Sequence, residues 1–435
     1  MKEVDEMRFE LVHPAEQLIM IMDRIYKYGM TTTSGGNLSI RDEDGDIWIT
    51  PSGIDKGTLT VEDIIQVKAD GTIIGKHKPS CELPFHQSTY RMRPDIRAVL
   101  HAHSPALVSF SIVRRLPDTK LIPNAALIFG EVGLAEYGLP GSEDLGCKIS
   151  EVFKQGINTV LLENHGAVVV GEDLYQAFMV FETLDFCARM EIAARRIGKP
   201  IALTAEDMDM ANSRKNAQMQ EFIPLNVSSD EKKARKMICE MVHRSYDQML
   251  FTSTQGAVST RLEDGSFLIT PDLADRKYLD TKEIVRIEQG KKEAGKVPDS
   301  LVSLHQSIYS KHSHINTIIT AQPPNIMAFS VTREKFDSRT IPESYIVLRN
   351  IPKLPFESSY IHPDKIAEIF KKDTPIVLID NDSIIVTGNS LINAFDRLEV
   401  AEYSAKALID SKVLGDVVII NDEQIDEIEE AFDLK

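Results

Sequence analysis

The chain has 435 residues, 43% of them hydrophobic and 26% charged, and its 49 basic and 66 acidic side chains leave a net charge of −17 at pH 7. This length predicts two or three domains, and the composition is typical of a globular protein. The acidic balance argues against nucleic acid and anionic membranes as partners.

Targeting signals and membrane spans are not expected. The first residues, MKEVDEMRFE, lack the pattern of a signal peptide, and no apolar run approaches the roughly 20 residues of a membrane-spanning helix. The four cysteines are far apart and fit no C-x-x-C motif, so we expect reduced thiols in a cytoplasmic protein.

The first predicted elements are a helix and a β-hairpin. Residues 14–29 carry apolar side chains at helical spacing and end at a glycine, which predicts an amphipathic helix. Residues 38–40 and 47–49 alternate as strands around the Asp-Gly turn at 44–45.

Two polar, glycine-bearing loops flank this hairpin. They read Ser34-Gly35-Gly36-Asn37 and Thr50-Pro51-Ser52-Gly53. Such loops either present backbone N–H groups and short hydroxyls to an anion or are ordinary turns, in which Gly, Asn and Ser are common anyway.

The next stretch carries the residues that indicate chemistry. His101 and His103 follow the apolar run 98–100, and alternate residues of a strand share a face, so both imidazoles should point into one pocket. Two histidines at this spacing, without further ligands, can also be simply hydrogen-bonded or exposed. His165 supplies a third imidazole and Glu82 a carboxylate, a set that indicates a catalytic divalent-metal site with an open position.

The rest of the first half alternates strands and helices. Residues 61–63 and 64–68 predict a short helix start and a strand, and residues 121–138 a loop and a strand. Residues 142–155 and 172–197 predict helices.

The sequence contains an internal repeat. Residues 259–272 parallel 39–52, residues 301–324 parallel 82–105, and residues 376–388 parallel 159–171. We therefore expect two copies of one α/β module, residues 1–225 and 226–435. Each copy should be a layered α/β/α fold, and the hairpins favour a mixed, mostly antiparallel sheet over an all-parallel one.

The copies differ where the metal site is expected. In the second copy the histidines and the acid are replaced, and the two loops change as well. The aligned pairs are Glu82 and Leu301, His101 and Thr320, His103 and Gln322, His165 and Asp382, Asn37 and Ala257, and Gly53 and Leu273. The second copy is thus expected to keep the fold without the metal site.

The segments SGGNLS, ITPSG, PSCE, HAHS and ENHG occur in this order within residues 14–197. As a set they resemble the class II aldolase/adducin family. The second half looks like a degenerate member of the same family, comparable to adducin head domains.

The resemblance implies a lyase that cleaves or forms a carbon–carbon bond of a sugar phosphate through a metal-stabilised ene-diolate. It implies Zn²⁺, or another divalent metal, on His101, His103 and His165, with Glu82 as acid and base. It also implies a homo-oligomer in which the second copy packs against the first. The implied phosphate-binding residues are Ser34, Gly36, Asn37, Ser52, Gly53, Ser80 and Cys81, the last at a position where the family usually has serine.

Other activities remain open at this stage. Dehydratases, decarboxylases and 4-epimerases of sugar phosphates use similar residues, although the epimerases carry aspartate where this chain has Glu82. A non-enzymatic, adducin-like assembly module is a further alternative. The family's aldolases also use tyrosines of a middle loop and of the C-terminal tail as proton donors. Tyr137 is a candidate for the middle-loop tyrosine. No tyrosine lies between Tyr175 and Tyr246 to supply the second one.

Overall fold

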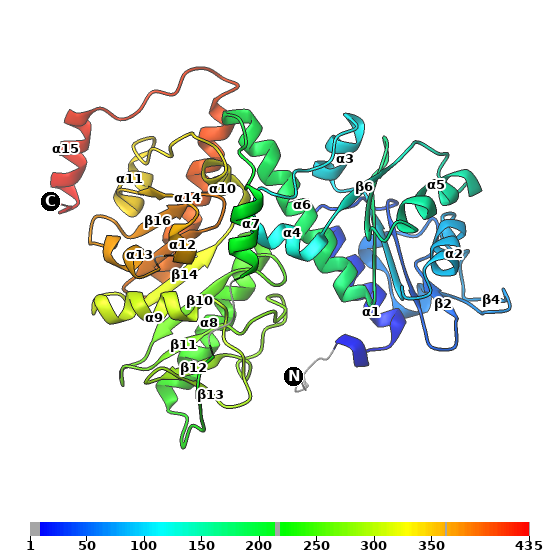
Figure 1. The fold of residues 1–435 in the computed structure, drawn as a ribbon, viewed down its shortest axis with the longest axis horizontal. Coiled ribbons are helices and arrows are strands. Elements are labelled where there is room, and N and C mark those ends of the chain that lie inside the picture. The colour runs from blue at the N-terminus through cyan, green and yellow to red at the C-terminus, as the bar shows by residue number, and fades with distance from the viewer. Residues whose placement is uncertain (1–8, 214–217, 362, 435) are drawn as a thin grey trace. The chain divides into compact units, whose positions relative to one another are not determined.

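The computed structural model describes residues 9–213, 218–361 and 363–434. The chain forms two compact units, one of Met1–Thr119 and Asn124–Ala188 and one of Lys120–Pro123 and Arg189–Lys435 (Figure 1). The modules 1–225 and 226–435 stay a prediction. Within the described residues, every helix is too short or too polar to cross a lipid bilayer.

An eight-stranded sheet lies at the centre of the first unit, in the order β4-β3-β2-β1-β5-β8-β7-β6. β6 and β7 are parallel, and the other neighbouring strands are antiparallel. The predicted mixed, mostly antiparallel sheet is therefore confirmed. The strands are β1 (Asn37–Arg41), β2 (Ile47–Ile49), β3 (Ile65–Val67), β4 (Ile73–Ile74), β5 (Ala98–Ala102), β6 (Val132–Ala135), β7 (Thr159–Leu162) and β8 (Ala167–Gly171).

Helices cover both faces of this sheet. α1 contacts β1 and β2, and the Arg24 guanidinium of α1 lies 4.5 Å from the centre of the Phe178 ring of α6, so these two helices share one face. α2 and α5 pack against each other on the other face. The helices of this half are α1 (Pro14–Lys27), α2 (Leu83–Met92), α3 (Pro105–Ile112), α4 (Pro123–Phe129), α5 (Glu143–Phe153) and α6 (Leu174–Ile197), with short 3-10 helices at Phe9–Leu11, Lys56–Thr58 and Val61–Asp63.

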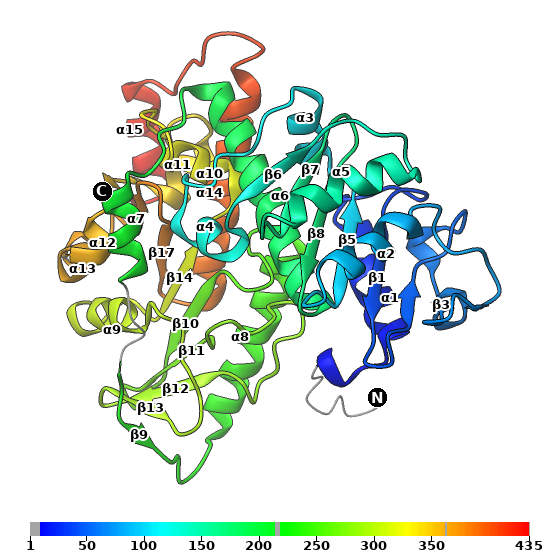
Figure 2. The same ribbon diagram turned by 45° about the vertical axis from the view of Figure 1, so that its right-hand side comes forward.

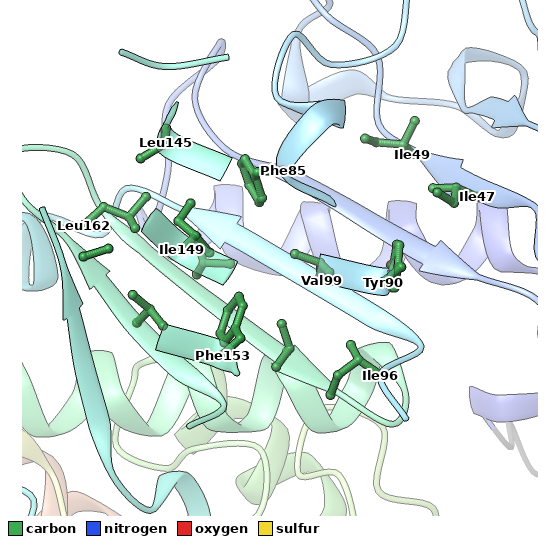
Figure 3. Close-up of a cluster of buried hydrophobic side chains, with 14 of the residues drawn as sticks. Ile47, Ile49, Phe85, Tyr90, Ile96, Val99, Leu145, Ile149, Phe153 and Leu162 are labelled. Carbon is green, nitrogen blue, oxygen red and sulfur yellow. The ribbon is translucent and has the colours of Figure 1, made fainter. Parts of the chain in front are cut away.

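The core between the sheet and the pair α2 and α5 ends at the predicted metal site. Figure 3 shows Phe85 and Tyr90 of α2 and Phe153 of α5 over the strands. Burying each such side chain stabilises the fold by about 1.5–3 kcal/mol. Val99 of β5 belongs to this core, and His101, two residues further along the strand, faces the same side.

The second unit has a sheet of the same order with one more edge strand. The order is β15-β16-β17-β14-β10-β11-β12-β13-β9, and Figure 2 labels the part of this sheet from β17 through β14, β10, β11, β12 and β13 to β9. Its register also repeats the first sheet, since Ala257 pairs with Thr320 as Asn37 pairs with His101. The strands are β9 (Glu221–Phe222), β10 (Ala257–Arg261), β11 (Phe267–Ile269), β12 (Val285–Glu288), β13 (Lys291–Glu293), β14 (Thr317–Ala321), β15 (Lys353–Leu354), β16 (Ile376–Ile379) and β17 (Ile384–Gly388).

The helices of the second half include the connection between the copies. α7 lies in the polar stretch after residue 200 and begins at a capping box of Thr204 and Asp207. The helices are α7 (Ala205–Asn212), α8 (Ser229–Asp247), α9 (Val302–Lys311), α10 (Pro324–Ser330), α11 (Pro342–Leu348), α12 (Ser358–Ile361), α13 (Pro363–Ile369), α14 (Leu391–Ser411) and α15 (Asp422–Ala431).

Most predicted elements of the first half are present within one or two residues of their expected bounds. The prediction of a loop before the strand in residues 121–138 is wrong, because α4 occupies Pro123–Phe129. Proline is tolerated at the first helical position, and Ala125 and Phe129 are buried, so tertiary packing stabilises a segment too short to signal a helix by periodicity.

Candidate metal and active site

His101 and His103 lie at one end of β5. His101 is fully buried inside the strand, and His103 follows the strand end. Their rings are 4.7 Å apart between centres, and the two Nε2 atoms are 2.9 Å apart. The structure therefore directs both imidazoles toward one point.

His165 comes from the turn between β7 and β8. The turn places Asn164 at φ +56° and packs Gly166 so closely on β5 that a Cβ there would lie 2.6 Å from the Ala102 carbonyl oxygen. The His165 ring lies 4.7 Å from that of His101 and 4.8 Å from that of His103. One nitrogen from each of the three rings lies within 4.8 Å of the others.

All three imidazoles are held neutral. Burial lowers the pKa of His101 to about 3, with a further contribution from His165. Burial also lowers the pKa of His103 to about 3, helped by the other two rings. Burial lowers the pKa of His165, although the Glu82 carboxylate opposes this shift. Neutral imidazole is the form that binds a metal ion.

The tautomer of His101 suits a metal ligand. Its Nδ1 lies 2.9 Å from the Ala167 carbonyl oxygen, which only accepts hydrogen bonds, so Nδ1 carries the proton. The Nε2 lone pair then faces His103 and the centre of the cluster. Metal-ligating histidines commonly donate their other N–H to a backbone carbonyl in this way.

The Glu82 carboxylate lies beside the three rings. Its Oε2 is 3.4 Å from Nε2 of His101, and its Oε1 is 3.9 Å from Nε2 of His165. The residue is 4% exposed and precedes α2. Glu82 Oε1 and His165 Nδ1 are buried and have no hydrogen-bond partner among the described residues. Three neutral nitrogens beside a carboxylate with an unpartnered oxygen fit a divalent cation.

Asn37 holds the Glu82 carboxylate and in turn contacts His86, a residue that the sequence analysis missed. Asn37 donates from Nδ2 to Glu82 Oε2 at 2.6 Å, and Oδ1 of Asn37 lies 2.5 Å from Nε2 of His86. His86 is one helical turn after Glu82, and both copies contain the sequence HQS at this position, starting at His86 and at His305. That repeated histidine was the available signal.

Two of the predicted phosphate-binding residues, Gly36 and Ser80, lie beside these groups. Gly36 has φ +70°, and a Cβ there would lie 2.7 Å from the His101 carbonyl oxygen. Ser80 donates its N–H to the Thr50 carbonyl oxygen at 3.2 Å, and its hydroxyl accepts from the Glu82 N–H. Ser52, Gly53 and Cys81 are exposed.

Lys56 is a second residue that sequence reasoning missed. Its side chain is buried, and its ammonium donates to the Pro51 carbonyl oxygen at 2.5 Å. Its N–H donates to the Thr33 carbonyl oxygen, which ties it to the first loop. Burial lowers the pKa of Lys56 to about 8. Among the described residues no carboxylate pairs with this ammonium.

The aligned positions of the second unit form no such cluster. Asp382 accepts hydrogen bonds from the hydroxyls of Ser359 and Tyr360, and Gln322 donates to the Asp382 carbonyl oxygen. Thr320 stands where the first copy has His101. Within the described residues, the three histidines of the first unit are the only group of three or more side chains placed to hold a metal ion.

The chain was compared with known proteins. A family model described as Class II Aldolase and Adducin N-terminal domain matches residues 16–192 and again 236–409. The two ranges together cover more than half of the 435 residues. The chain belongs to the class II aldolase and adducin family. The predicted family is confirmed, and the family model matches both halves.

Curated relatives match less than half of the chain. L-fuculose phosphate aldolase of Methanococcus maripaludis is 36% identical over 172 residues, 39% of this chain and 89% of that protein. The 5-deoxy-D-ribulose 1-phosphate aldolase of Bacillus thuringiensis is 33% identical over 199 residues, 45% of this chain and 91% of that protein. The 3-oxo-tetronate 4-phosphate decarboxylase of Haemophilus influenzae is 32% identical over 179 residues, 40% of this chain and 85% of that protein.

A solved structure of L-fuculose 1-phosphate aldolase is 30% identical, with a TM-score of 0.41, and covers 45% of this chain and 93% of that chain.

Proposed function

We propose that the chain is a metal-dependent lyase that cleaves or forms a carbon–carbon bond of a sugar phosphate. The observation that carries this proposal is the convergence of three neutral imidazoles beside Glu82, whose Oε1 has no hydrogen-bond partner among the described residues. The relatives named as aldolases of phosphorylated sugars support it.

His101, His103 and His165 would hold the cation, and we propose Zn²⁺ because imidazole nitrogen with an open position suits this ion. When bound, such an ion acts as a Lewis acid and offsets negative charge on substrate oxygens by on the order of several kcal/mol. The protein keeps the three ligands neutral by burial, so they need not lose a proton first.

Glu82 would move the proton. Cleaving a ketose 1-phosphate leaves negative charge at the carbon next to the carbonyl, and a positioned carboxylate can carry a proton to or from that carbon. Asn37 holds Oε2 of Glu82, and Oε1 stays available for this transfer.

The predicted phosphate-binding segments would bind the phosphate. The proposed contacts are Ser34, Gly36, Asn37, Ser52, Gly53, Ser80 and Cys81. The protein's net charge of −17 disfavours an approaching anion, so local positive charge is needed. The buried Lys56 ammonium, held against Pro51 in the second loop, supplies such a charge beside these contacts.

Decarboxylation is the second candidate. Relatives named 3-oxo-tetronate 4-phosphate decarboxylase match at 32–33% identity, close to the values for the aldolases. Loss of CO₂ from a 3-oxo acid leaves the same charge next to a carbonyl, so the same residues would serve.

The deciding experiment incubates the zinc-loaded full chain with ketose 1-phosphates and with 3-oxo-acid 4-phosphates. Release of dihydroxyacetone phosphate, abolished by a chelator and restored by Zn²⁺, is the expected result. Release of CO₂ instead would establish the decarboxylase. A purified protein without bound metal and without either product would favour the assembly module.

We also propose a homo-oligomer in the cytoplasm, in which the second copy supplies packing surface to the first. No disulfide joins the four cysteines, which suits a reducing compartment. Light scattering of the purified chain measures the oligomeric state. A strictly monomeric, fully active enzyme would refute the proposed oligomer.

A further inference from the structure

A row of buried side chains connects α2 and β1 to Glu82. Besides the bonds of Asn37 to Glu82 and to His86, Nδ1 of His86 lies 2.6 Å from the Ser39 hydroxyl, and Ser39 lies 2.7 Å from the Tyr90 hydroxyl. Each of these five residues is at most 4% exposed. The row therefore has no access to water that could replace a missing partner.

The carboxylate fixes the direction of every hydrogen bond in the row. An ionised Glu82 only accepts, so Asn37 turns its NH₂ group toward Glu82 and its oxygen toward His86. His86 must then donate from Nε2 and accept at Nδ1 from the Ser39 hydroxyl. Burial lowers the pKa of His86 to about 3, which keeps the ring neutral and leaves this one tautomer.

The second unit keeps only part of this row. There Nδ1 of His305 lies 2.8 Å from the Ser259 hydroxyl, and Ser259 lies 2.8 Å from the Tyr309 hydroxyl. Nε2 of His305 lies 3.1 Å from the Thr320 hydroxyl. Ala257 stands at the position of Asn37, so this copy keeps His, Ser and Tyr without an amide or a carboxylate beyond them.

We propose that His86 is a positioning residue that, through Asn37, fixes the orientation of the Glu82 carboxylate. The donor on His86 prevents the Asn37 amide from rotating its oxygen toward Glu82, where two acceptors would repel each other. Oε2 of Glu82 is thereby held, and Oε1 is left facing the histidine cluster.

The kinetic part of the test rests on the proposed lyase activity. His86→Leu should lower kcat per zinc-loaded protein by roughly 10–100-fold, the range for partners that orient metal-site residues, with KM little changed. His86→Gln should recover most of this loss, because its amide N–H can replace the Nε2 donor. The matched variant His305→Leu removes the same histidine–serine contact in the second unit and should leave kcat unchanged.

A purely structural role for His86 predicts a different pattern, in which His86→Leu and His305→Leu both lower the melting temperature and neither changes kcat per zinc-loaded protein. That result would overturn the proposal. If His86→Leu does not fold, Asn37→Ala replaces it, since the second copy folds with alanine at this position. Asn37→Ala should retain zinc and lose kcat to the same extent.

Crystal structures provide a measurement that is independent of activity. In His86→Leu the Asn37 amide should rotate and the Glu82 carboxylate should leave its position, whereas in His305→Leu both should stay. Unchanged Asn37 and Glu82 in His86→Leu would refute the positioning role. A wild type without lyase activity would refute the proposed function, while the crystallographic comparison would still decide the role of His86.

Discussion

At the scale of single residues, the site depends on burial that keeps histidines neutral. His101 sits in a strand surrounded by core side chains, and desolvation disfavours its charged form. The Ala167 carbonyl then selects the tautomer with a lone pair on Nε2. An exposed histidine lacks this burial, so it is not an equivalent ligand.

Glu82→Gln should retain metal and lose turnover. Glutamine keeps the size of the side chain but cannot accept a proton, so kcat should fall by about 10²–10⁴-fold, the usual contribution of a general acid or base. Steady-state kinetics with metal analysis measures this. Glu151→Gln, on the exposed surface of α5, is the control and should match the wild type. Full activity of Glu82→Gln would remove Glu82 from the mechanism.

His101→Ala should lose metal affinity. It removes a ligand, so the loss should exceed the roughly 100-fold that removal of an outer-shell partner can cost. Competition with a chelating dye measures the affinity. The chain has a second H-x-H motif, His312-Ser313-His314. His314→Ala is the matched control, because His314 is exposed and is not part of the cluster. A His101→Ala protein that is fully loaded and active would contradict the ligand assignment.

At the scale of elements, the histidines meet because a turn packs on a strand end. β5 supplies His101 and is followed by His103, and the β7–β8 turn supplies His165. Gly166 allows the turn to approach β5, since any side chain at this position would collide with the Ala102 carbonyl oxygen. The geometry of the site is thus a property of two neighbouring elements.

Gly166→Ala should push this turn away from β5. The added methyl group would lie 2.6 Å from the Ala102 carbonyl oxygen and 2.8 Å from His103 Cδ2, so the backbone must shift. We expect a loss of about 1–3 kcal/mol in the free energy of unfolding and weaker zinc binding.

Urea denaturation and zinc competition measure both effects of Gly166→Ala. Gly146→Ala is the control, because a Cβ there meets its nearest atom at 3.4 Å, and alanine favours a helix over glycine by about 1 kcal/mol. Equal stability of the two variants would show that the turn has room to adjust.

At the scale of the whole molecule, the two copies share a buried histidine that contacts a serine, which in turn contacts a tyrosine. Burial lowers the pKa of His86 and of His305 to about 3, below the usual value of 6.5. The unfolded chain takes up protons below pH 6.5 that the folded chain cannot bind, so each such histidine makes the fold less stable as pH falls from 6.5 toward 3.

The metal-free protein should therefore lose stability between pH 7.5 and 5.5. Each buried histidine contributes a slope that rises from about 0.7 kcal/mol per pH unit at pH 6.5 toward about 1.4 kcal/mol per pH unit at pH 5.5. Chemical denaturation at several pH values measures the slope. His305→Gln removes one titrating group outside the cluster of His101, His103 and His165, so the pH dependence of stability should become shallower. An unchanged slope in this variant would show that His305 titrates normally in the folded state.

The fold and much of the site were predictable because they depend on local patterns. Strand alternation, turn glycines and the similar sequences of the two halves predicted two layered α/β copies. The H-x-H motif after an apolar run predicted paired imidazoles. The short helix α4 was missed because packing rather than periodicity stabilises it. The second copy's lack of ligands followed from the aligned residues alone.

The sequence by itself determined the family, the repeat and the candidate ligands, since each is written in residue types at fixed spacings. Only the tertiary structure decided that Asn37 joins Glu82 to His86 and that Lys56 is buried against the second loop. Asn37 and Glu82 are 45 residues apart, and their contact depends on the side-chain orientations that strand register and helix packing impose. No local sequence pattern encodes such a contact, because it forms only when elements that are distant in the sequence pack together.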